Sequence, residues 1–402
     1  MTLLDKASII IPRGAASKTG ASSGVLYGFN PNTKALVPIT TVQNTANLTR
    51  INEASLIENV LSNVLPRDFT NGGCGDYAIW PQRTNIFLRS NEIDNASWVK
   101  GNSGNGILPV VTANYAISPD GTNNADRVQF SRAGTAATDR SFITQTVTGA
   151  LNTNYSNGVW LKSNTGVNQN ILIFGNFGTG SVKIVTVTNQ WQRFQANLAN
   201  TGGSTNVNIT VGLGYTAMTE TSADILVSYV QGEAGDYPSA NIKTEGSTET
   251  RDAMVPSKTS ASALIGQASG GIYFEIAPFT TTESRISLSD GTDDEKVEIL
   301  LDTNITLDLN TSAGTDTLLA NLGTVAANTW TKIIARYLVN NIALHQNGVQ
   351  LGENLSGAVF SGTTLNTIQF AAFDGSTPFY GRFREMVIFD DSPTQAESNS
   401  IT

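Results

Sequence analysis

The sequence predicts an all-β protein with two β-sandwich domains behind an extended N-terminal region. Many short segments alternate apolar and polar residues, and turns rich in glycine and asparagine separate them. Charged residues make up only 14% of the 402 positions, too few for the Glu, Lys and Arg that long helices use. The hydrophobic fraction of 40% is enough to fill real cores, which argues against a disordered chain.

The first sandwich is predicted over residues 85–255. Within 207–213 every second residue is apolar, which is the pattern of a half-buried strand. Residues 128–130 and 225–229 show the same alternation, and a Pro-Asp-Gly turn lies at 119–121. Many strands with no helix between them favour a sandwich over a sheet covered by helices.

The second sandwich is predicted over residues 262–402, after a linker at 256–261. Residues 305–309 alternate in the same way. Asn347-Gly348 lies between two strand patterns, and this dipeptide readily adopts the positive φ angles of a tight hairpin turn.

Two short helices are also predicted. Apolar residues recur at helical spacing after Asn52, which favours an amphipathic helix over 52–64. One helical turn is expected at the C-terminus, with Ser392 as its cap, Pro393 at its first position and Gln395 completing a capping box.

Residues 1–84 show the weakest periodic pattern of apolar and polar residues in the chain. The small residues at 14–24 are expected to be flexible or extended, and the turn-rich residues 71–75 help to close the region. A region this long without a clear core is expected to pack against something else.

The ionisable residues exclude several function classes. A single cysteine, Cys74, rules out an internal disulfide framework and a cysteine-rich zinc site. A net charge of −9 argues against nucleic acid as a partner. The chain opens without a secretory signal pattern, and its apolar runs are far shorter than the ~18 residues that span a bilayer, so no membrane insertion is expected.

An ordered series of motifs runs through the first two regions. It comprises TRIN at 49–52, NGGC at 71–74, PQRTN at 81–85, SNEIDNASW at 90–98, PDGTNNAD at 119–126, GVWLK at 158–162, VQGEAGDYPS at 230–239 and TRDA at 250–253. The series resembles bacteriophage head-spike and tail-fibre proteins, whose middle domain is a jelly roll similar to carbohydrate-binding modules. The resemblance implies that residues 1–84 are an extended, mostly irregular virion-attachment region, which disfavours the helix over 52–64. The family usually has glycine near Ser55, where this sequence departs from it.

The third region resembles the laminin-G/concanavalin A-like lectin jelly roll. The matching segments are GIYFEI at 271–276, WTKII at 330–334, the Asn347-Gly348 hairpin and YGRFREMVIF at 380–389. This resemblance implies a second jelly roll and identifies no ligand.

Enzymatic activity is not expected. His345 is the only imidazole and is expected to be an exposed strand residue, so a Ser-His-Asp triad is discarded. Glycoside hydrolysis needs two carboxylates at a suitable separation. The candidates are Glu275, Glu298, Glu385 and Asp308, and the sequence does not show that any two converge.

Glycan binding would use aromatic faces together with polar side chains. Trp160 has the best case for facing the concave side of a sheet, and Trp98 is the second candidate. Burial in the core is the competing interpretation, because large aromatic side chains are usually mostly buried. Trp191 and Trp330 immediately precede alternating strands, where packing in a core or along an edge is expected.

Calcium is the one metal that the composition permits, because calcium takes oxygen ligands. Asp94, Asp126 and Asp252 occur where jelly rolls of the resembled kind sometimes hold a structural ion. No other cofactor is expected.

The leading hypothesis is a non-enzymatic virion structural protein, a surface fibre or spike of the bacteriophage head or tail. Residues 1–84 would contact capsid or tail proteins, and the two sandwiches would bind host cell-surface glycans for host adhesion. Proteins of the resembled kind commonly form oligomers, so a homo-oligomer, a dimer or trimer mediated by the N-terminal region, is expected, and repeated copies would make weak glycan sites strong. The protein would reside on the virion surface after assembly in the host cytoplasm. The alternatives are a purely architectural decoration protein and a polysaccharide depolymerase.

Overall fold

The computed structural model describes most of the chain. The described residues are 3–11, 26–29, 36–42, 48–61, 64–175, 182–196, 199–200, 202–216, 218–312, 316–362 and 364–402. The small-residue stretch at 14–24 lies outside these ranges, so its expected extended form stays a prediction.

The chain folds into two compact units. We call them the C-terminal unit, formed by Met1–Asn44, Leu61–Pro81 and Ala253–Thr402, and the middle unit, formed by Thr45–Val60 and Gln82–Asp252. The segment 1–84, expected as one region, is therefore divided between the two units. Its role in attachment to a virion stays a prediction.

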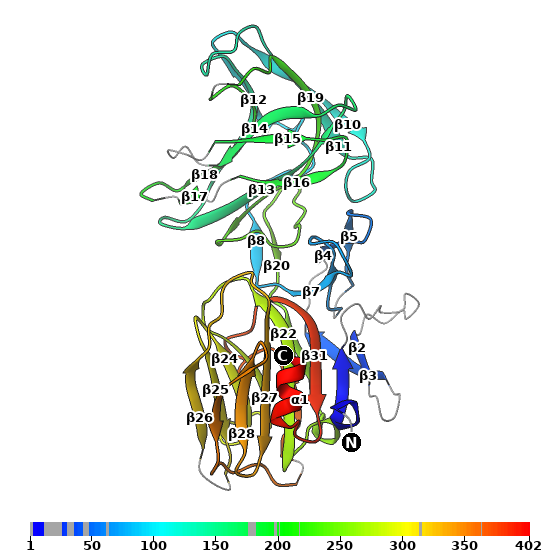
Figure 1. Cartoon of the computed structure of the whole chain (residues 1–402). Coiled ribbons are helices and arrows are strands. Elements are labelled where there is room, and N and C mark those ends of the chain that lie inside the picture. The colour runs from blue at the N-terminus through cyan, green and yellow to red at the C-terminus, as the bar shows by residue number, and fades with distance from the viewer. Residues whose placement is uncertain are drawn as a thin grey trace. The chain divides into compact units, whose positions relative to one another are not determined.

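The middle unit is a sandwich of two antiparallel sheets (Figure 1). The first runs in the order β10–β11–β19–β13–β16 with β17 also paired to β13, and the second runs β15–β14–β18–β12–β9. The strands are β9 (Val99–Ser103), β10 (Gly106–Ala116), β11 (Ala125–Arg132), β12 (Arg140–Thr148), β13 (Asn154–Ser163), β14 (Gln169–Gly175), β15 (Lys183–Val187), β16 (Gln192–Gln195), β17 (Ala199–Asn200), β18 (Asn206–Leu213) and β19 (Ser222–Ala234). A smaller pair joins β8 (Arg83–Asn85) to β20 (Glu249–Arg251).

The core of the middle unit lies between its two sheets. Val207, Ile209 and Val211 of β18 pack with Val128 of β11 and Ile225 of β19. The strands predicted at 128–130, 207–213 and 225–229 are confirmed, because each carries the alternating apolar residues that the sandwich buries.

The helix predicted over 52–64 is wrong. Strands β4 (Thr49–Ile51) and β5 (Ile57–Asn59) form a hairpin there. The Asn52 side chain accepts hydrogen bonds from the backbone N–H groups of Ala54 and Leu56, and Ser55 takes a positive φ of 60°. A local side-chain turn of this kind competes with helix formation.

The C-terminal unit is built on one hydrogen-bonded strand order (Figure 1): β26–β25–β24–β23–β30–β21–β3–β2–β1–β31–β22–β27–β28–β29. Strand β7 also pairs with β31 and with β6. The strands are β1 (Ala7–Ile11), β2 (Leu26–Phe29), β3 (Leu36–Val42), β6 (Arg67–Asp68), β7 (Asp76–Ile79), β21 (Val255–Lys258), β22 (Ser269–Pro278), β23 (Ser284–Ser289), β24 (Lys296–Leu301), β25 (Ile305–Asn310), β26 (Thr317–Leu322), β27 (Thr331–Leu338), β28 (Ile342–Gln346), β29 (Val349–Asn354), β30 (Thr367–Gln369) and β31 (Gly381–Phe389). The 3-10 helices are η1 (Leu3–Lys6) and η2 (Ser262–Leu264).

Aromatic residues connect β30 and β31, which are not neighbours in this strand order. Phe370, just after β30, stacks on Phe383 of β31 with ring centroids 5.1 Å apart. The Asn347-Gly348 hairpin is confirmed between β28 and β29, with positive φ at both residues. The linker expected at 256–261 is not a separate spacer, because most of β21 falls within it and pairs with β3 and β30.

The terminal helix α1 (Gln395–Ile401) begins two residues later than predicted. Thr394 is its cap and forms a capping box with Glu397, so the predicted roles of Ser392 and Gln395 are wrong. Thr394-x-x-Glu397 is the stronger box, because the glutamate at the third position accepts the backbone N–H of the cap.

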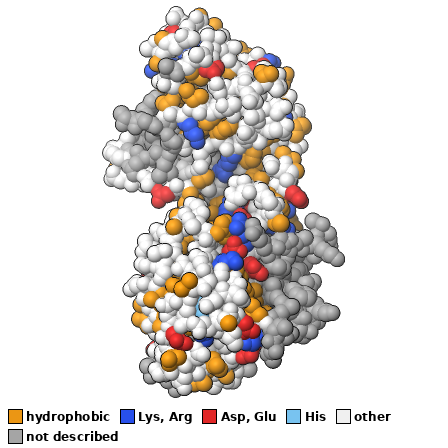
Figure 2. All heavy atoms as spheres, viewed as in Figure 1, with side chains coloured by type: hydrophobic (Ala, Val, Ile, Leu, Met, Phe, Trp, Pro, Cys, Tyr) orange, Lys and Arg blue, Asp and Glu red, His pale blue; other side chains and the backbone are white. Residues whose placement is uncertain are grey.

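The all-β fold class is confirmed by this architecture. On the face drawn in Figure 2, charged side chains are scattered and most of the surface is uncharged. Of the helices in the described ranges, none combines the length and the hydrophobicity of a bilayer-spanning helix.

Candidate functional site

The strands of the C-terminal unit place a row of polar side chains on one sheet face. Ile286, Ile299 and Leu307 on β23, β24 and β25 are buried on the core side. Successive residues of a strand point to opposite faces, so the residues between them point away from the core. Glu298 pairs in register with Ser287 on one side and Asp308 on the other. We call Arg285, Ser287, Lys296, Glu298, Asp308 and Gln369 the polar face.

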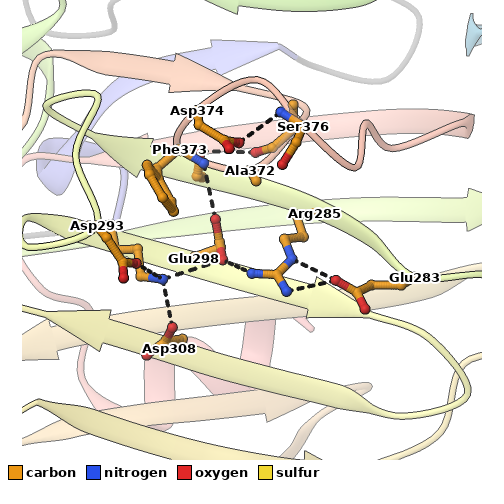
Figure 3. Close-up of polar contacts among 12 residues, drawn as sticks. Glu283, Arg285, Asp293, Glu298, Asp308, Ala372, Phe373, Asp374 and Ser376 are labelled. Carbon is orange, nitrogen blue, oxygen red and sulfur yellow. Dashed lines mark hydrogen bonds and ion pairs between the residues drawn. The ribbon is translucent and has the colours of Figure 1, made fainter.

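Glu298 is the buried centre of the polar face (Figure 3). Its Oε1 accepts a short hydrogen bond from Arg285 Nη1 and lies 3.6 Å from Lys296 Nζ. Its Oε2 accepts the backbone N–H of Phe373 at 3.0 Å. Both carboxylate oxygens therefore have partners within the protein.

Lys296 joins the acidic residues of the face. Its Nζ lies 2.7 Å from both Asp293 Oδ1 and Asp308 Oδ2. Burial alone would lower the pKa of Lys296, but the hydrogen bonds to Asp293 and Asp308 and the charge of Glu298 raise it above its usual value. The ammonium thus stays charged and fixes the carboxylates around it.

The loop 371–378 covers one side of the polar face (Figure 3). Ser287 Oγ donates to the carbonyl of Ala371 at 2.9 Å, and Gln369 Nε2 donates to the carbonyl of Ala372. The Phe373 ring centroid lies 5.1 Å from Lys296 Nζ, a cation–π contact. The loop is therefore held on the sheet by polar contacts at several points.

A rim of accessible groups surrounds this fixed base. Asp293 is 64% exposed, Glu283 is 47% exposed and ion-paired to Arg285 at 2.6 Å, and Asp374 is exposed. Phe373 is half-buried. Carboxylates accept hydrogen bonds from hydroxyl groups, and an aromatic ring packs against C–H groups. This arrangement suits a ligand whose ring carries hydroxyl groups and has an apolar face.

Of the predicted carboxylates, the structure brings together two pairs. Glu298 is the strand partner of Asp308, and Glu275 is the strand partner of Glu385. Arg384 contacts Glu275 at 3.3 Å, and its guanidinium carbon lies 3.7 Å from the ring centroid of Trp330. Trp330 thus packs under an arginine, in keeping with the packing role expected for it.

The expected exposure of His345 is wrong. Its side chain is fully buried, because α1 packs over β28. His345 Nδ1 lies 2.8 Å from Asn399 Oδ1, and Nε2 accepts from Arg336 Nε at 3.1 Å. The ring therefore has structural partners on both nitrogens.

The two tryptophans proposed for glycan binding are both buried. Trp98 is 1% exposed in the core of the middle unit, and its Nε1 donates to the carbonyl of Arg89. Trp160 is 4% exposed beneath the β4–β5 hairpin, packed against Ile57 and Tyr229. Stacking on a sugar does not fit these placements, because neither ring presents a free face. Trp191 is half-buried against the same cluster.

Asp94 and Asp126 do lie together. Asp126 Oδ2 accepts the backbone N–H of Asp94 at 3.0 Å, and Lys100 Nζ donates to the carbonyls of Asp94 and Asn95 at 2.8 and 2.9 Å. Burial raises the pKa of Asp126. Within the described ranges, no three His, Cys, Asp or Glu side chains gather closely enough to hold a metal, so Asp252 does not complete the expected set. The carbonyl oxygens of Asp94 and Asn95 are thus already occupied by the ammonium of Lys100, which a calcium ion would have to displace.

Sequence reasoning missed Arg285, Lys296 and Phe373. Arg285 and Lys296 occupy polar positions of strands that alternate apolar and polar residues, and this alternation can be seen in the sequence. Phe373 lies in a loop, and nothing local indicates that its backbone N–H reaches Glu298.

Residues 258–397 match the family model described as the concanavalin A-like lectin/glucanases superfamily. This range contains the whole polar face and the loop that covers it. The match confirms the resemblance of the third region to this superfamily. The comparison with curated proteins returned no match.

Three solved structures similar to parts of the chain have low TM-scores. Domain 4 of a Geobacillus stearothermophilus arabinanase in complex with arabinotriose is 13% identical over 37% of this chain and 72% of that one, with a TM-score of 0.32. The CBM40 of a Ruminococcus gnavus IT-sialidase, bound to α2,3-sialyllactose, is 16% identical over 35% and 86%, with a TM-score of 0.31. A CBM22 tandem domain of Paenibacillus barcinonensis Xyn10C is 12% identical over 79% and 93%, with a TM-score of 0.25.

Proposed function

We propose that the polar face and its rim bind a glycan, and that the protein is a non-enzymatic surface fibre or spike of a bacteriophage virion. The observation that carries glycan binding is the arrangement of Phe373 and exposed carboxylates on a base fixed by Arg285 and Lys296. Its position inside residues 258–397, the lectin-like range, supports this proposal.

The non-enzymatic part rests on the pairing of the carboxylates. A glycosidase needs one carboxyl group as an acid and another as a base or nucleophile. Glu298 contacts two cations and a backbone N–H, and Asp308 contacts Lys296. These contacts suit rigid recognition and leave neither group poised for proton transfer.

The virion role rests on the ordered motif series between 49 and 253, which resembles head-spike and tail-fibre proteins. A weakly charged β protein can be displayed in many copies, and multivalency then strengthens weak sites. A dimer or trimer is expected by light scattering of the full chain, and a monomer would count against this arrangement. Electron microscopy of antibody-labelled virions tests the location on head or tail.

An array of bacterial surface polysaccharides tests glycan binding directly. The full chain should bind a subset of the array, and Phe373→Ala should weaken that binding about tenfold through loss of ring contact. Leu355→Ala, at a residue 67% exposed outside the polar face, is the matched control and should bind normally. Silence of the full chain across the array would reject glycan binding and favour the decoration protein. Release of reducing ends from any polymer would instead establish a depolymerase.

A further inference from the structure

The charges of the polar face and its rim do not balance. Five carboxylates lie there with two cations, and both cations contact carboxylates of this same set. The carboxylates are those of Glu283, Asp293, Glu298, Asp308 and Asp374, and the cations are those of Arg285 and Lys296. These side chains together therefore carry three more negative charges than positive ones.

Both cations are engaged and shielded. Lys296 has only 4% of its side chain exposed, and its Nζ contacts three carboxylates of the set. All three guanidinium nitrogens of Arg285 are in use: Nε and Nη2 donate to Glu283 at 3.0 and 2.6 Å, and Nη1 donates to Glu298. A negatively charged ligand would find no unpaired cation among these described residues. It would meet carboxylates instead, which repel it.

Acceptor oxygens remain beside the Phe373 ring (Figure 3). Asp293 and Asp308 each use one oxygen on Lys296, and within the described ranges the second oxygen of each has no partner. Asp374 is exposed and accepts a backbone hydrogen bond at 2.8 Å. An ionised carboxylate accepts hydrogen bonds and donates none. The surface around the ring therefore favours a ligand that donates hydrogen bonds and carries no negative charge.

A metal ion does not account for this excess of negative charge. Within the described ranges, no three Asp, Glu, His or Cys side chains gather closely enough to hold one. Figure 3 shows the carboxylates of Glu283, Asp293 and Asp374 on different sides of Glu298 rather than around one point. A ligand whose donors are spread over its body fits this spacing better than a single ion does.

We propose that the glycan bound at the polar face carries protonated amino groups, as a chain of glucosamine units does. This inference rests on the proposed glycan-binding function and names the class of sugar. A protonated amine supplies three N–H donors and a positive charge to the unpartnered carboxylate oxygens. The C–H face of the sugar ring packs against Phe373. N-acetylation removes the charge, and a uronic acid reverses it.

Isothermal titration calorimetry of the full chain with three matched sugars tests the proposal. They are a glucosamine hexamer, the N-acetylglucosamine hexamer of the same linkage and a galacturonic acid hexamer, at low ionic strength and about pH 6, where the amine is protonated. We expect the glucosamine hexamer to bind with a Kd of about 0.1 mM and the N-acetylated hexamer at least about tenfold more weakly. The galacturonic acid hexamer should not bind.

Variants of the full chain locate the binding. Phe373→Ala should weaken binding of the glucosamine hexamer about tenfold through loss of ring contact. Asp374→Asn removes one exposed charge at nearly constant shape and should weaken it about threefold. Asp236→Asn removes an exposed charge from the middle unit instead, so it is the matched control and should change the affinity by less than about 1.5-fold.

The outcomes separate this inference from the proposed function. Equal or tighter binding of the N-acetylated or the galacturonic acid hexamer overturns the amino-sugar preference. Glycan binding itself stands in that case if Phe373→Ala still weakens it. Hexalysine is the control for simple attraction of a cation to an acidic chain. Binding of hexalysine as tight as that of the glucosamine hexamer, or glucosamine binding unchanged in Phe373→Ala, would also reject the preference. If Asp374→Asn fails to fold, the comparison of the three hexamers on the unaltered chain still decides.

Discussion

Glu298 lies directly opposite Asp308 across the β24–β25 strand pair, on the sheet face turned away from the core. Two carboxylates side by side repel each other, and the ammonium of Lys296 contacts both. Arg285 adds a second cation to Glu298. The polar face is therefore a charge network whose parts depend on one another.

Lys296→Met should lower the free energy of unfolding of the C-terminal unit by about 3 kcal/mol, because it leaves buried Glu298 with one cation fewer. Urea unfolding monitored by circular dichroism measures the change. Lys258→Met, at a half-buried lysine outside the polar face whose Nζ donates to the carbonyl of Thr259, is the control and should stay within about 0.5 kcal/mol of the parent. Equal stability of the two variants would show that the network contributes little.

The strands could be read from the sequence because their signal is local. Val207, Ile209 and Val211 alternate within one strand, and the sandwich buries them as that period requires. Lys296 and Glu298 alternate with apolar residues of β24, so their place on the polar side of the strand is also a local signal. Their pairing with Asp308 is not, because it depends on strand register.

Burial that comes from distant segments could not be read locally. His345 is covered by Asn399 of α1, and Trp160 by Ile57 of a hairpin about one hundred residues earlier in the chain. The apolar spacing after Asn52 suggested a helix, but the Asn52 side chain closes a turn instead. In each case a tertiary or side-chain contact outweighs the pattern.

Acidification should destabilise the C-terminal unit through His345. Burial is the largest effect on His345 and lowers its pKa below 6.5. The hydrogen bond to Asn399 opposes this shift, and the charges of Arg336, which lowers the pKa, and Glu353, which raises it, follow in size. As pH falls, the unfolded chain therefore binds the extra proton first. The contribution of neutral His345 to the free energy of unfolding is therefore fully present above about pH 6.5. It is lost as the pH falls toward the pKa of His345 in the folded protein, by at most about 1.4 kcal/mol per pH unit.

Urea unfolding between about pH 7.5 and 5 measures this loss for the parent chain and for His345→Gln. Glutamine keeps hydrogen-bonding capacity without titrating, so the variant should lose less stability on acidification. Carboxylates contribute equally to both chains and cancel in the comparison. Parallel pH profiles would show that His345 does not titrate in this window.

Ile57→Ala should loosen the β4–β5 hairpin from the sandwich of the middle unit. Ile57 is buried against Trp160, and truncation of a buried isoleucine costs about 2–4 kcal/mol. Tryptophan fluorescence should shift to longer wavelength as water reaches Trp160 and Trp191. Leu61→Ala, at a residue 66% exposed, is the control and should leave the spectrum unchanged. An unshifted spectrum in Ile57→Ala would mean that the hairpin stays in place without this contact.

Calcium removal should leave the thermal stability of the protein unchanged. The carbonyls of Asp94 and Asn95 already accept hydrogen bonds from Lys100, and Asp126 accepts backbone N–H groups from Asp94 and Asn114. A calcium ion would have to displace the ammonium and compete with these donors for oxygen ligands. Calorimetric scans with and without EDTA, together with elemental analysis of the purified protein, measure the effect. A lower Tm in EDTA that calcium restores and magnesium does not would instead support the calcium site predicted at Asp94, Asp126 and Asp252.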